Sequence, residues 1–242
     1  MLSKKNIIIL GCNGLIGDSL FKSKILNEKF NIIGIDKEKK KFSKFFYKLD
    51  LINYKKFYKV LESISKKYGK IHSVVNCTYP KIYQKKELLK IDTKLLQLEI
   101  SNHVGIFFNV MQNFSNFLIK NKEKGVVINF SSIYGGYTPR FEIYKDTKMS
   151  MPIQYAICKN SINSMTKYFA KMLNKKNLKF YTISPGGIED GQNKKFIKEY
   201  SKFTNRGMLK KNELNGLVNF LLSEDASKLQ GNNFVIDDGF TL

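Results

Sequence analysis

Residues 151–171, MPIQYAICKNSINSMTKYFAK, decide how the rest of the chain is interpreted. A helix is predicted from just after Pro152, because proline is favoured at a first helical turn. Tyr155 and Lys159 lie four residues apart, so both side chains leave the same face of this helix. A lysine ammonium beside a phenol favours the phenolate and lowers the tyrosine pKa from about 10 toward neutrality. The pair therefore predicts a general acid and base.

The same spacing occurs once more, at Tyr144 and Lys148. The downstream sequence distinguishes the two pairs, because a strand and a sharp turn are predicted from residue 178 onward. The helix that carries Tyr155 leads directly to this strand. The path from Lys148 would need an additional segment containing Pro152, so we assign the acid–base role to Tyr155.

Length and composition predict one folded α/β domain over residues 1–242, because 43% of the residues are hydrophobic and 13% are aromatic. No apolar run approaches the ~20 residues of a membrane span. The apolar run at 7–10 is also too short for the core of a signal peptide. We expect a cytoplasmic protein without a membrane partner.

The net charge of +22 raises nucleic acid as a partner. However, only two of the 42 basic residues are arginines, and the lysines are spread through every segment. We therefore expect no specific nucleic-acid partner. The three cysteines are widely spaced, which suits a reducing compartment and predicts no metal site.

A glycine-rich turn comes after the first predicted strand, at 6–10, and precedes an amphipathic stretch that reaches residue 29. The order of strand, glycine turn and helix is typical of a dinucleotide site, where backbone approaches a pyrophosphate at a helix N-terminus. The candidate cofactor residues of this turn, GCNGLIG, are Gly11, Asn13, Gly14, Leu15, Ile16 and Gly17.

An acidic residue closes the second predicted strand, at 31–35. Asp36 lies 19 residues after Gly17, where a carboxylate accepts hydrogen bonds from the adenosine ribose and repels a 2′-phosphate. NAD is therefore favoured as the cofactor. The neighbouring Lys37 leaves NADP open.

Strands and helices alternate along the remaining chain. Further strands are predicted at 45–49, 71–75, 126–130, 178–183 and 234–236, and helices at 53–69, within 87–120 and at 210–222. This alternation predicts a single Rossmann-type, doubly wound parallel sheet with helices on both faces.

The motifs YAICK at 155–159, ISPGG at 183–187 and NHVG at 102–105 together resemble the short-chain dehydrogenase/reductase family. The resemblance implies that Ser132 orients the reacting oxygen, with Ser131 as the alternative. It also implies that Asn102 supports a proton relay through water, and that Lys159 binds the nicotinamide ribose and lowers the pKa of Tyr155.

The resemblance also implies further cofactor contacts, at Asp50, Leu51, Asn76, Pro185 and Ile188, in addition to Tyr155 and Lys159. Two segments are then expected to surround the substrate. One is a long insert at about 137–151 with basic side chains that suit a phosphate or carboxylate, and the other is a lid at about 187–206. We refer to them as the insert and the lid.

The runs SSIYGGYTPRFEIYKDT, PIQYAICK, SPGGIEDGQ and IDDGFTL are similar to one branch of this family, the flagellin-modification protein A type, which occurs among genes for sialic-acid-like and other surface sugars. This resemblance implies an oxidoreductase that acts on a sugar or activated sugar. It also implies a homodimer or homotetramer built through helices at about 95–120 and 153–173.

Two alternatives remain open. The glycine spacing G-x-x-G-x-x-G is one residue shorter between its first two glycines than in most of the family, which favours a nucleotide-sugar epimerase or dehydratase that retains NAD. A non-catalytic nucleotide-binding protein is the other alternative.

Overall fold

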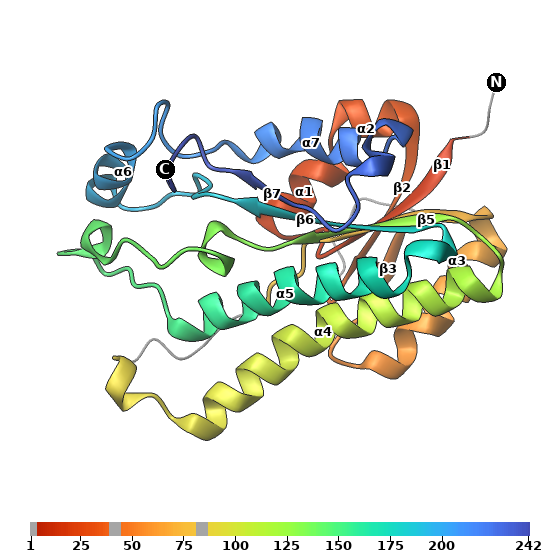
Figure 1. The fold of residues 1–242 in the computed structure, drawn as a ribbon, viewed down its shortest axis with the longest axis horizontal. Coiled ribbons are helices and arrows are strands. Elements are labelled where there is room, and N and C mark those ends of the chain that lie inside the picture. Colours follow the sequence, from red (N-terminus) through yellow and green to blue (C-terminus); the bar gives the residue numbers. More distant parts are fainter. Residues whose placement is uncertain (1–3, 39–44, 81–86) are drawn as a thin grey trace.

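A parallel β-sheet forms the centre of the protein, as expected, in a computed structural model that describes residues 4–38, 45–80 and 87–242. Its seven strands have the order β3-β2-β1-β4-β5-β6-β7 (Figure 1). The order reverses beside β1, which is the arrangement of a doubly wound fold. The strands are β1 Lys5–Leu10, β2 Phe30–Asp36, β3 Phe46–Lys48, β4 Ile71–Asn76, β5 Gly125–Phe130, β6 Leu178–Pro185 and β7 Asn233–Ile236.

Helices cover both faces of the sheet, which confirms the predicted fold class. One face carries α3 (Phe57–Tyr68), α4 (Thr93–Lys120) and α5 (Ile153–Met172), and the other carries α1 (Leu15–Phe21), α2 (Lys24–Lys29) and α7 (Leu214–Leu221) (Figure 1). Each layer has its own apolar core against the sheet. Because the central strands are buried on both faces, they are continuous apolar runs, as Ile7, Ile8 and Ile9 of β1 illustrate.

Two helical segments differ from the sequence prediction. The amphipathic stretch after the glycine turn is two helices, α1 and α2, because Ser23 caps a new helix by accepting a hydrogen bond from the Leu26 amide. The lid, expected as a polar stretch, contains helix α6 (Lys194–Ser201). This helix buries Phe196 and Tyr200, one turn apart.

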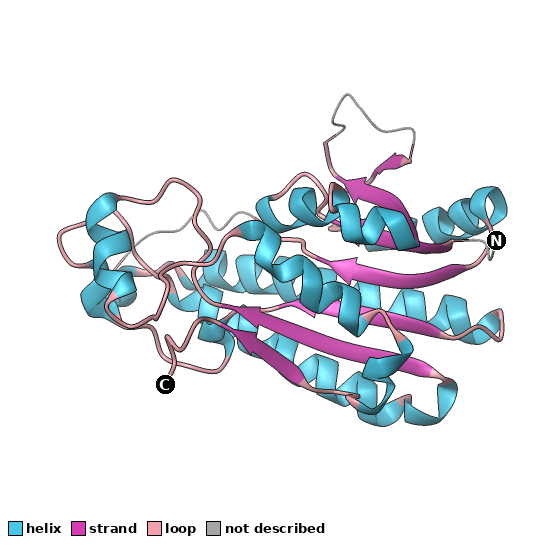
Figure 2. Ribbon diagram, turned by 90° about the horizontal axis from the view of Figure 1, so that it is seen from above, coloured by secondary structure: helices cyan, strands magenta, loops and turns pink. Residues whose placement is uncertain are grey.

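The insert and the lid lie together beyond the carboxyl ends of the strands. Figure 2 shows the C-terminus at this same end of the molecule, and the Tyr200 ring of α6 stacks on Phe240 of the C-terminal turn, with ring centres 4.2 Å apart. Tyr144 of the insert packs on Phe196 of α6, with ring centres 5.2 Å apart. Asp146 accepts a hydrogen bond of 2.9 Å from Lys195. This ion pair is largely exposed and contributes little, so the aromatic packing holds the insert to the lid.

Arg140 of the insert also binds the C-terminal turn. Its guanidinium lies 4.4 Å from the ring centre of Phe203 and 5.6 Å from that of Phe240. It donates at 3.4 Å to the carbonyl oxygens of Phe240 and Leu242. The basic side chains of the insert were expected to bind a phosphate or carboxylate. Arg140 instead joins the insert to the lid, through Phe203, and to the C-terminal turn.

Among the helices of the described residues, none is both long and apolar enough to cross a membrane.

Candidate active site

Lys159 joins α5 to the end of β5. Its ammonium donates a 3.0 Å hydrogen bond to the Phe130 carbonyl, and the Ser131 hydroxyl donates at 2.8 Å to the Lys159 carbonyl. Gly135 lies against the same turn of α5, because a Cβ there would come within 2.8 Å of the Lys159 carbonyl group. The lysine side chain is therefore fixed at the carboxyl edge of the sheet, with only 5% of its surface exposed.

Tyr155 lies one turn before Lys159 and contacts Ser132. Burial raises the pKa of the Tyr155 phenol, and a hydrogen bond with the Ser132 side chain lowers it, with a net rise. Burial therefore moves the pKa of this phenol in the direction opposite to the one predicted from the neighbouring lysine. The Lys159 ammonium does not offset it, because it lies 5.6 Å from the centre of the Tyr155 ring and donates to a backbone carbonyl.

Burial also changes the acidity of the neighbouring groups. It lowers the pKa of Lys159 to about 8, an effect that the Cys158 and Cys77 thiols oppose. It raises the pKa of Cys158 to about 11. For this thiol, desolvation outweighs the opposing effect of the adjacent Lys159 charge.

Aromatic rings enclose the lysine ammonium. Its nitrogen lies 5.8 Å from the ring centres of both Tyr79 and Phe107. Tyr79 lies after β4 and packs edge-on against Tyr155, with ring centres 5.7 Å apart. Tyr79 thus forms an aromatic wall beside both Tyr155 and Lys159.

His103 joins the same aromatic group, although the sequence assigned it no role. Its ring centre lies 5.5 Å from that of Tyr79 and 5.8 Å from that of Phe107. Only 1% of its surface is exposed. A lone histidine in a helix carries no sequence signal of burial beside a lysine. Only the position of Phe107 one turn later, on the same face, indicated which way it points.

Asn102 is the neighbouring residue on α4, and it is half-buried. In the part of the chain that the structure describes, its side chain makes no hydrogen bond. The structure therefore brings Ser132, Tyr155 and Lys159 together but does not join Asn102 to them by a direct contact.

The glycine turn places backbone at the end of β1. Gly11 has φ of +73°, and a Cβ on Gly17 would lie 2.1 Å from the Gly11 carbonyl oxygen, so both positions require glycine. A Cβ on Gly14 would meet only that oxygen, at 3.3 Å. Leu15 and Ile16 open α1, directly after the turn.

Asp36 lies beside this turn at the end of β2. One carboxylate oxygen accepts from the Asn13 amide at 2.9 Å, and the other accepts from the Lys37 amide at 2.8 Å. A carboxylate has about four acceptor sites. Asp36 thus retains capacity for the hydroxyl groups of a ribose.

The other predicted cofactor residues also lie at this edge of the sheet. Asp50 is exposed and accepts from the Ile52 amide, whereas Leu51 is buried. Pro185 ends β6, and Ile188 forms a bridge with Leu209.

Asn76 ends β4 and tests whether a polar ligand fits here. Its side-chain oxygen accepts from the amide and hydroxyl of Thr78, at 3.1 and 2.6 Å. Its side-chain nitrogen is buried and has no partner among the described residues. Asn76 pairs with Leu10, the residue before the glycine turn. Buried polar groups normally have partners, so an unsatisfied donor at this position fits a dinucleotide.

The rival tyrosine has a different environment. Tyr144 ends a short 3₁₀ helix at Phe141–Tyr144, and Lys148 lies beyond that helix. The Tyr144 hydroxyl lies 3.1 Å from the Tyr134 hydroxyl, and burial raises the pKa of Tyr144. Tyr144 and Lys148 therefore do not share a helical face.

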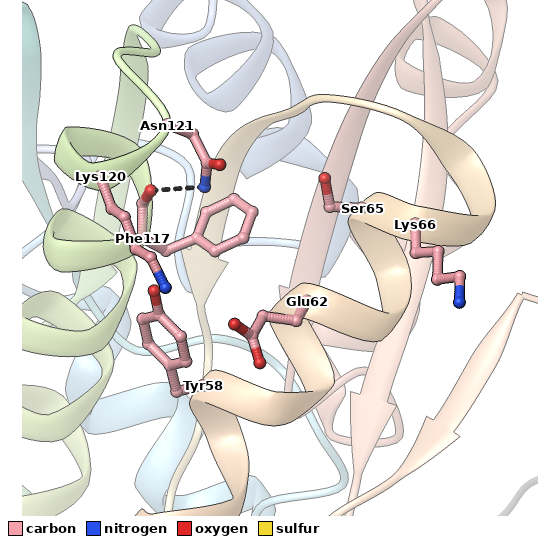
Figure 3. A pocket seen from close by; sticks show the side chains of 7 residues that line it. All are labelled: Tyr58, Glu62, Ser65, Lys66, Phe117, Lys120 and Asn121. Atoms are coloured by element: carbon pink, nitrogen blue, oxygen red, sulfur yellow. Dashed lines mark hydrogen bonds between the residues drawn. The ribbon is translucent and has the colours of Figure 1, made fainter.

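A surface groove lies away from these residues. The groove between α3 and α4 encloses about 280 Å³ and is lined by Tyr58, Glu62, Ser65, Lys66, Phe117, Lys120 and Asn121 (Figure 3). It lies at the end of α4 remote from His103.

Within the described residues, no group of three or more histidine, cysteine or acidic side chains could hold a metal ion.

The sheet order and the polar groups gathered at its carboxyl edge define an oxidoreductase of the dinucleotide-binding class. A family model described as enoyl-(acyl carrier protein) reductase matches residues 33–241. Post-translational flagellin modification protein A of Campylobacter coli is 30% identical over 258 aligned residues, which cover 100% of both chains. The chain belongs to the short-chain dehydrogenase/reductase family and is an NAD(P)-dependent oxidoreductase.

Solved structures agree with this assignment. A short-chain dehydrogenase from Leptospira borgpetersenii, solved with bound NAD+, is 26% identical and superimposes with a TM-score of 0.87 over 99% of this chain and 94% of its own. ElxO with NADP bound shares the fold, with a TM-score of 0.81 and 21% identity over 98% of this chain and 99% of its own. The expected family is thereby confirmed.

The buried ammonium generates a prediction about stability. Lys159→Met should raise the free energy of unfolding at pH 7 by up to about 3 kcal/mol, because the folded protein no longer holds a charge whose pKa burial lowers from 10.5 to about 8. The pKa is depressed in the folded state, so wild-type stability should rise from pH 8 to 10.5 and the advantage of the variant should vanish above that range. Urea unfolding across this pH range measures the difference.

Lys167→Met is the matched control, because Lys167 is exposed on the same helix. It should show no such pH dependence. A Lys159→Met protein that is less stable than wild type at pH 7 would contradict the buried-charge argument.

Proposed function

We propose that this oxidoreductase acts on a hydroxyl or carbonyl group of a sugar or activated sugar in surface-glycan biosynthesis. The observation that carries the proposal is the match to flagellin modification protein A, which runs through the complete chain and includes the insert and the lid. Another relative, the 3-oxoacyl-[acyl-carrier-protein] reductase FabG of Thermotoga maritima, is 26% identical and covers 81% of this chain and 76% of its own.

The side chains beside Tyr155 support a polyhydroxylated substrate. The hydroxyl groups of Tyr134 and Tyr144 lie 3.1 Å apart. Tyr134 contributes to the raised pKa of Tyr155, and Tyr155 contributes to the raised pKa of Tyr144. Tyrosine combines an apolar ring face with a hydrogen-bonding hydroxyl. Such a pair suits a sugar ring, which has both apolar faces and hydroxyl groups.

The cofactor-binding residues we propose are the glycine turn with Asn13, Leu15 and Ile16, then Asp36 for the ribose, and Asp50, Leu51, Asn76, Tyr155, Lys159, Pro185 and Ile188. NAD is the preferred cofactor, and NADP remains an alternative. When bound, the nicotinamide ring supplies hydride acceptance or donation.

The chain's own residues handle the proton. Tyr155 exchanges it with the substrate oxygen, and Ser132 holds that oxygen and the phenol in place. Lys159 would donate to the nicotinamide ribose. The resemblance to the family gives Asn102 the support of a relay through water. Positioned acid–base groups of this kind contribute ~10²–10⁴-fold to a rate.

A substrate screen tests the proposed function. Purified protein is mixed with NAD+ or NADH and a panel of sugar phosphates, nucleotide sugars and acyl thioesters, and the nicotinamide absorbance is followed. We expect turnover with members of the sugar panel. Turnover of acyl thioesters with no sugar turned over would overturn the sugar assignment.

The two alternatives give other results in the same screen. An epimerase or dehydratase that retains NAD would convert a nucleotide sugar without net change in nicotinamide absorbance, which product chromatography detects. A non-catalytic nucleotide-binding protein would bind NAD and convert nothing.

Tyr155→Phe should reduce kcat by about 10³-fold or more while NAD affinity changes little, because the phenol hydroxyl is the group that moves the proton. Tyr144→Phe is the matched control and should raise KM without a comparable loss of kcat. Steady-state kinetics and NAD titration measure both effects. The assignment fails if Tyr144→Phe proves inactive and Tyr155→Phe remains active.

Asp36→Ala should narrow the preference for NAD over NADP, because the variant no longer presents a negative charge to a 2′-phosphate. Glu38→Ala removes a similar charge two residues later from an exposed position and should leave the preference unchanged. Binding constants for both cofactors, measured by titration, give the ratio. A wild-type protein that prefers NADP would refute the role of Asp36.

We also propose a homodimer, with a homotetramer as the larger assembly, formed through α4 and α5. An apolar groove of about 370 Å³ runs between these helices. Large side chains beside it are exposed, including Phe108 at 45%, Tyr168 at 67% and Met172 at 64%. Exposed apolar patches of this kind mark interaction sites, and a second copy offers a matching surface by symmetry.

Tyr168→Glu should therefore convert the assembly to monomers, because it places a charge in the proposed interface. Tyr54→Glu is the control, since Tyr54 is similarly exposed but lies before α3. Sedimentation velocity separates the species. A monomeric wild-type protein would contradict the proposal.

We infer further that residues 1–242 act as one domain in which the insert and the lid cover the substrate, and that the protein is cytoplasmic. The three cysteines form no disulfide, which suits a reducing compartment. A nucleotide cofactor also suits the cytoplasm.

A further inference from the structure

His103 is the buried polar side chain that the proposed mechanism does not use. Both of its ring nitrogens are buried and have no hydrogen-bond partner within the described parts of the chain. A neutral imidazole has one donor and one acceptor nitrogen. Because buried polar groups are almost always satisfied, and water is the usual partner where protein groups are lacking, ordered water is expected beside this ring.

The position of the ring shows what such a water molecule would meet. The Lys159 ammonium and the His103 ring share two aromatic neighbours, Tyr79 and Phe107, each within 6 Å of both groups. Burial, and to a smaller extent the Lys159 charge, lower the pKa of His103 to about 3. The ring is therefore neutral throughout the physiological range and can accept a hydrogen bond.

The Lys159 ammonium has N–H donors that the protein does not use. A lysine has three N–H donors, and the Phe130 carbonyl takes one of them. Tyr79 and Phe107 offer ring faces to the charge but no strong acceptor. The imidazole, which shares both of these aromatic neighbours, has a ring nitrogen that can accept a hydrogen bond from a water molecule bound to this ammonium.

We propose that His103 is a positioning residue for proton transfer, and that its neutral imidazole holds a water molecule against the Lys159 ammonium. It acts through Lys159 and does not touch the substrate. The proposal rests on the roles assigned above to Tyr155 and Lys159. It gives the relay water to His103, whereas the resemblance to the family gives that water to Asn102.

The other titratable groups near His103 belong to three elements. Glu99 precedes it by one turn on α4 and accepts a 2.8 Å hydrogen bond from Gln154 of α5. Tyr79 lies after β4, and Tyr155 and Lys159 lie on α5. Of these, Lys159 supplies the positive charge that a bridging water would bind.

Nitrogen NMR tests the proposal without any substrate. The chain has two histidines, so protein labelled with ¹⁵N-histidine and saturated with NAD+ gives few ring signals. His72→Phe identifies the signals of His103 and serves as the control. We expect one His103 nitrogen to be a hydrogen-bonded acceptor, and we expect Lys159→Met to move it toward the shift of an unbonded acceptor. Ring nitrogens that are unbonded and indifferent to Lys159→Met would overturn the proposal.

Kinetics on the substrate found by the screen give the second readout. His103→Phe retains an aromatic ring beside Tyr79 and Phe107 but has no ring nitrogen. It should lower kcat about tenfold or more, shift the pH profile of kcat and leave the KM for NAD unchanged. His103→Gln restores a polar group and should recover most of the rate, while thermal unfolding confirms that each variant folds.

The outcomes are separable. If His103→Phe folds and retains the wild-type kcat and pH profile while Asn102→Ala loses activity, the relay water belongs to Asn102 and the proposal is wrong. If the screen yields no substrate, the proposed function fails, but the NMR result still decides the placement of the water.

Discussion

The site depends on the hydrogen-bonded contact between α5 and the end of β5. This contact is reciprocal, because the Lys159 side chain donates to the β5 carbonyl of Phe130 while the Ser131 hydroxyl donates to the Lys159 carbonyl. Asn160 and Asn163 add hydrogen bonds from α5 to the Gly135 carbonyl, at 2.9 and 3.1 Å. These contacts fix the relative positions of the serine segment and the helix. Ser132 is thereby held within hydrogen-bonding reach of Tyr155.

Most of the fold could be predicted because its strands are buried on both faces. Continuous β-branched runs such as that of β1 have few alternatives, and the glycine turn after it identifies the class. The division between α1 and α2 was missed, since the amphipathic pattern continues through Ser23 and only the cap reveals the break. Helix α6 was missed because Phe196 and Tyr200 lie among lysines, and their burial depends on aromatic partners distant in the sequence.

The sequence predicted which residues form the site better than it predicted their pKa values. Spacing placed Tyr155 and Lys159 on one face of one helix, and the structure shows them there. Spacing cannot report how much water surrounds them, so the predicted direction of the Tyr155 pKa shift was wrong. His103 illustrates the same limit. Its burial is a property of the packed aromatic group, to which β4, α4 and α5 each contribute.

The contacts of Arg140 have a consequence for how this enzyme can be remodelled. Because one guanidinium packs on Phe203 and Phe240 while Tyr144 packs on Phe196, the insert, the lid and the C-terminal turn form one cooperative unit. Grafting the insert from a relative without its matching lid would leave unpaired rings and a charge without its carbonyl partners. If the insert and the lid cover the substrate as proposed, a change of substrate range should require all three segments to be exchanged together on an unchanged sheet.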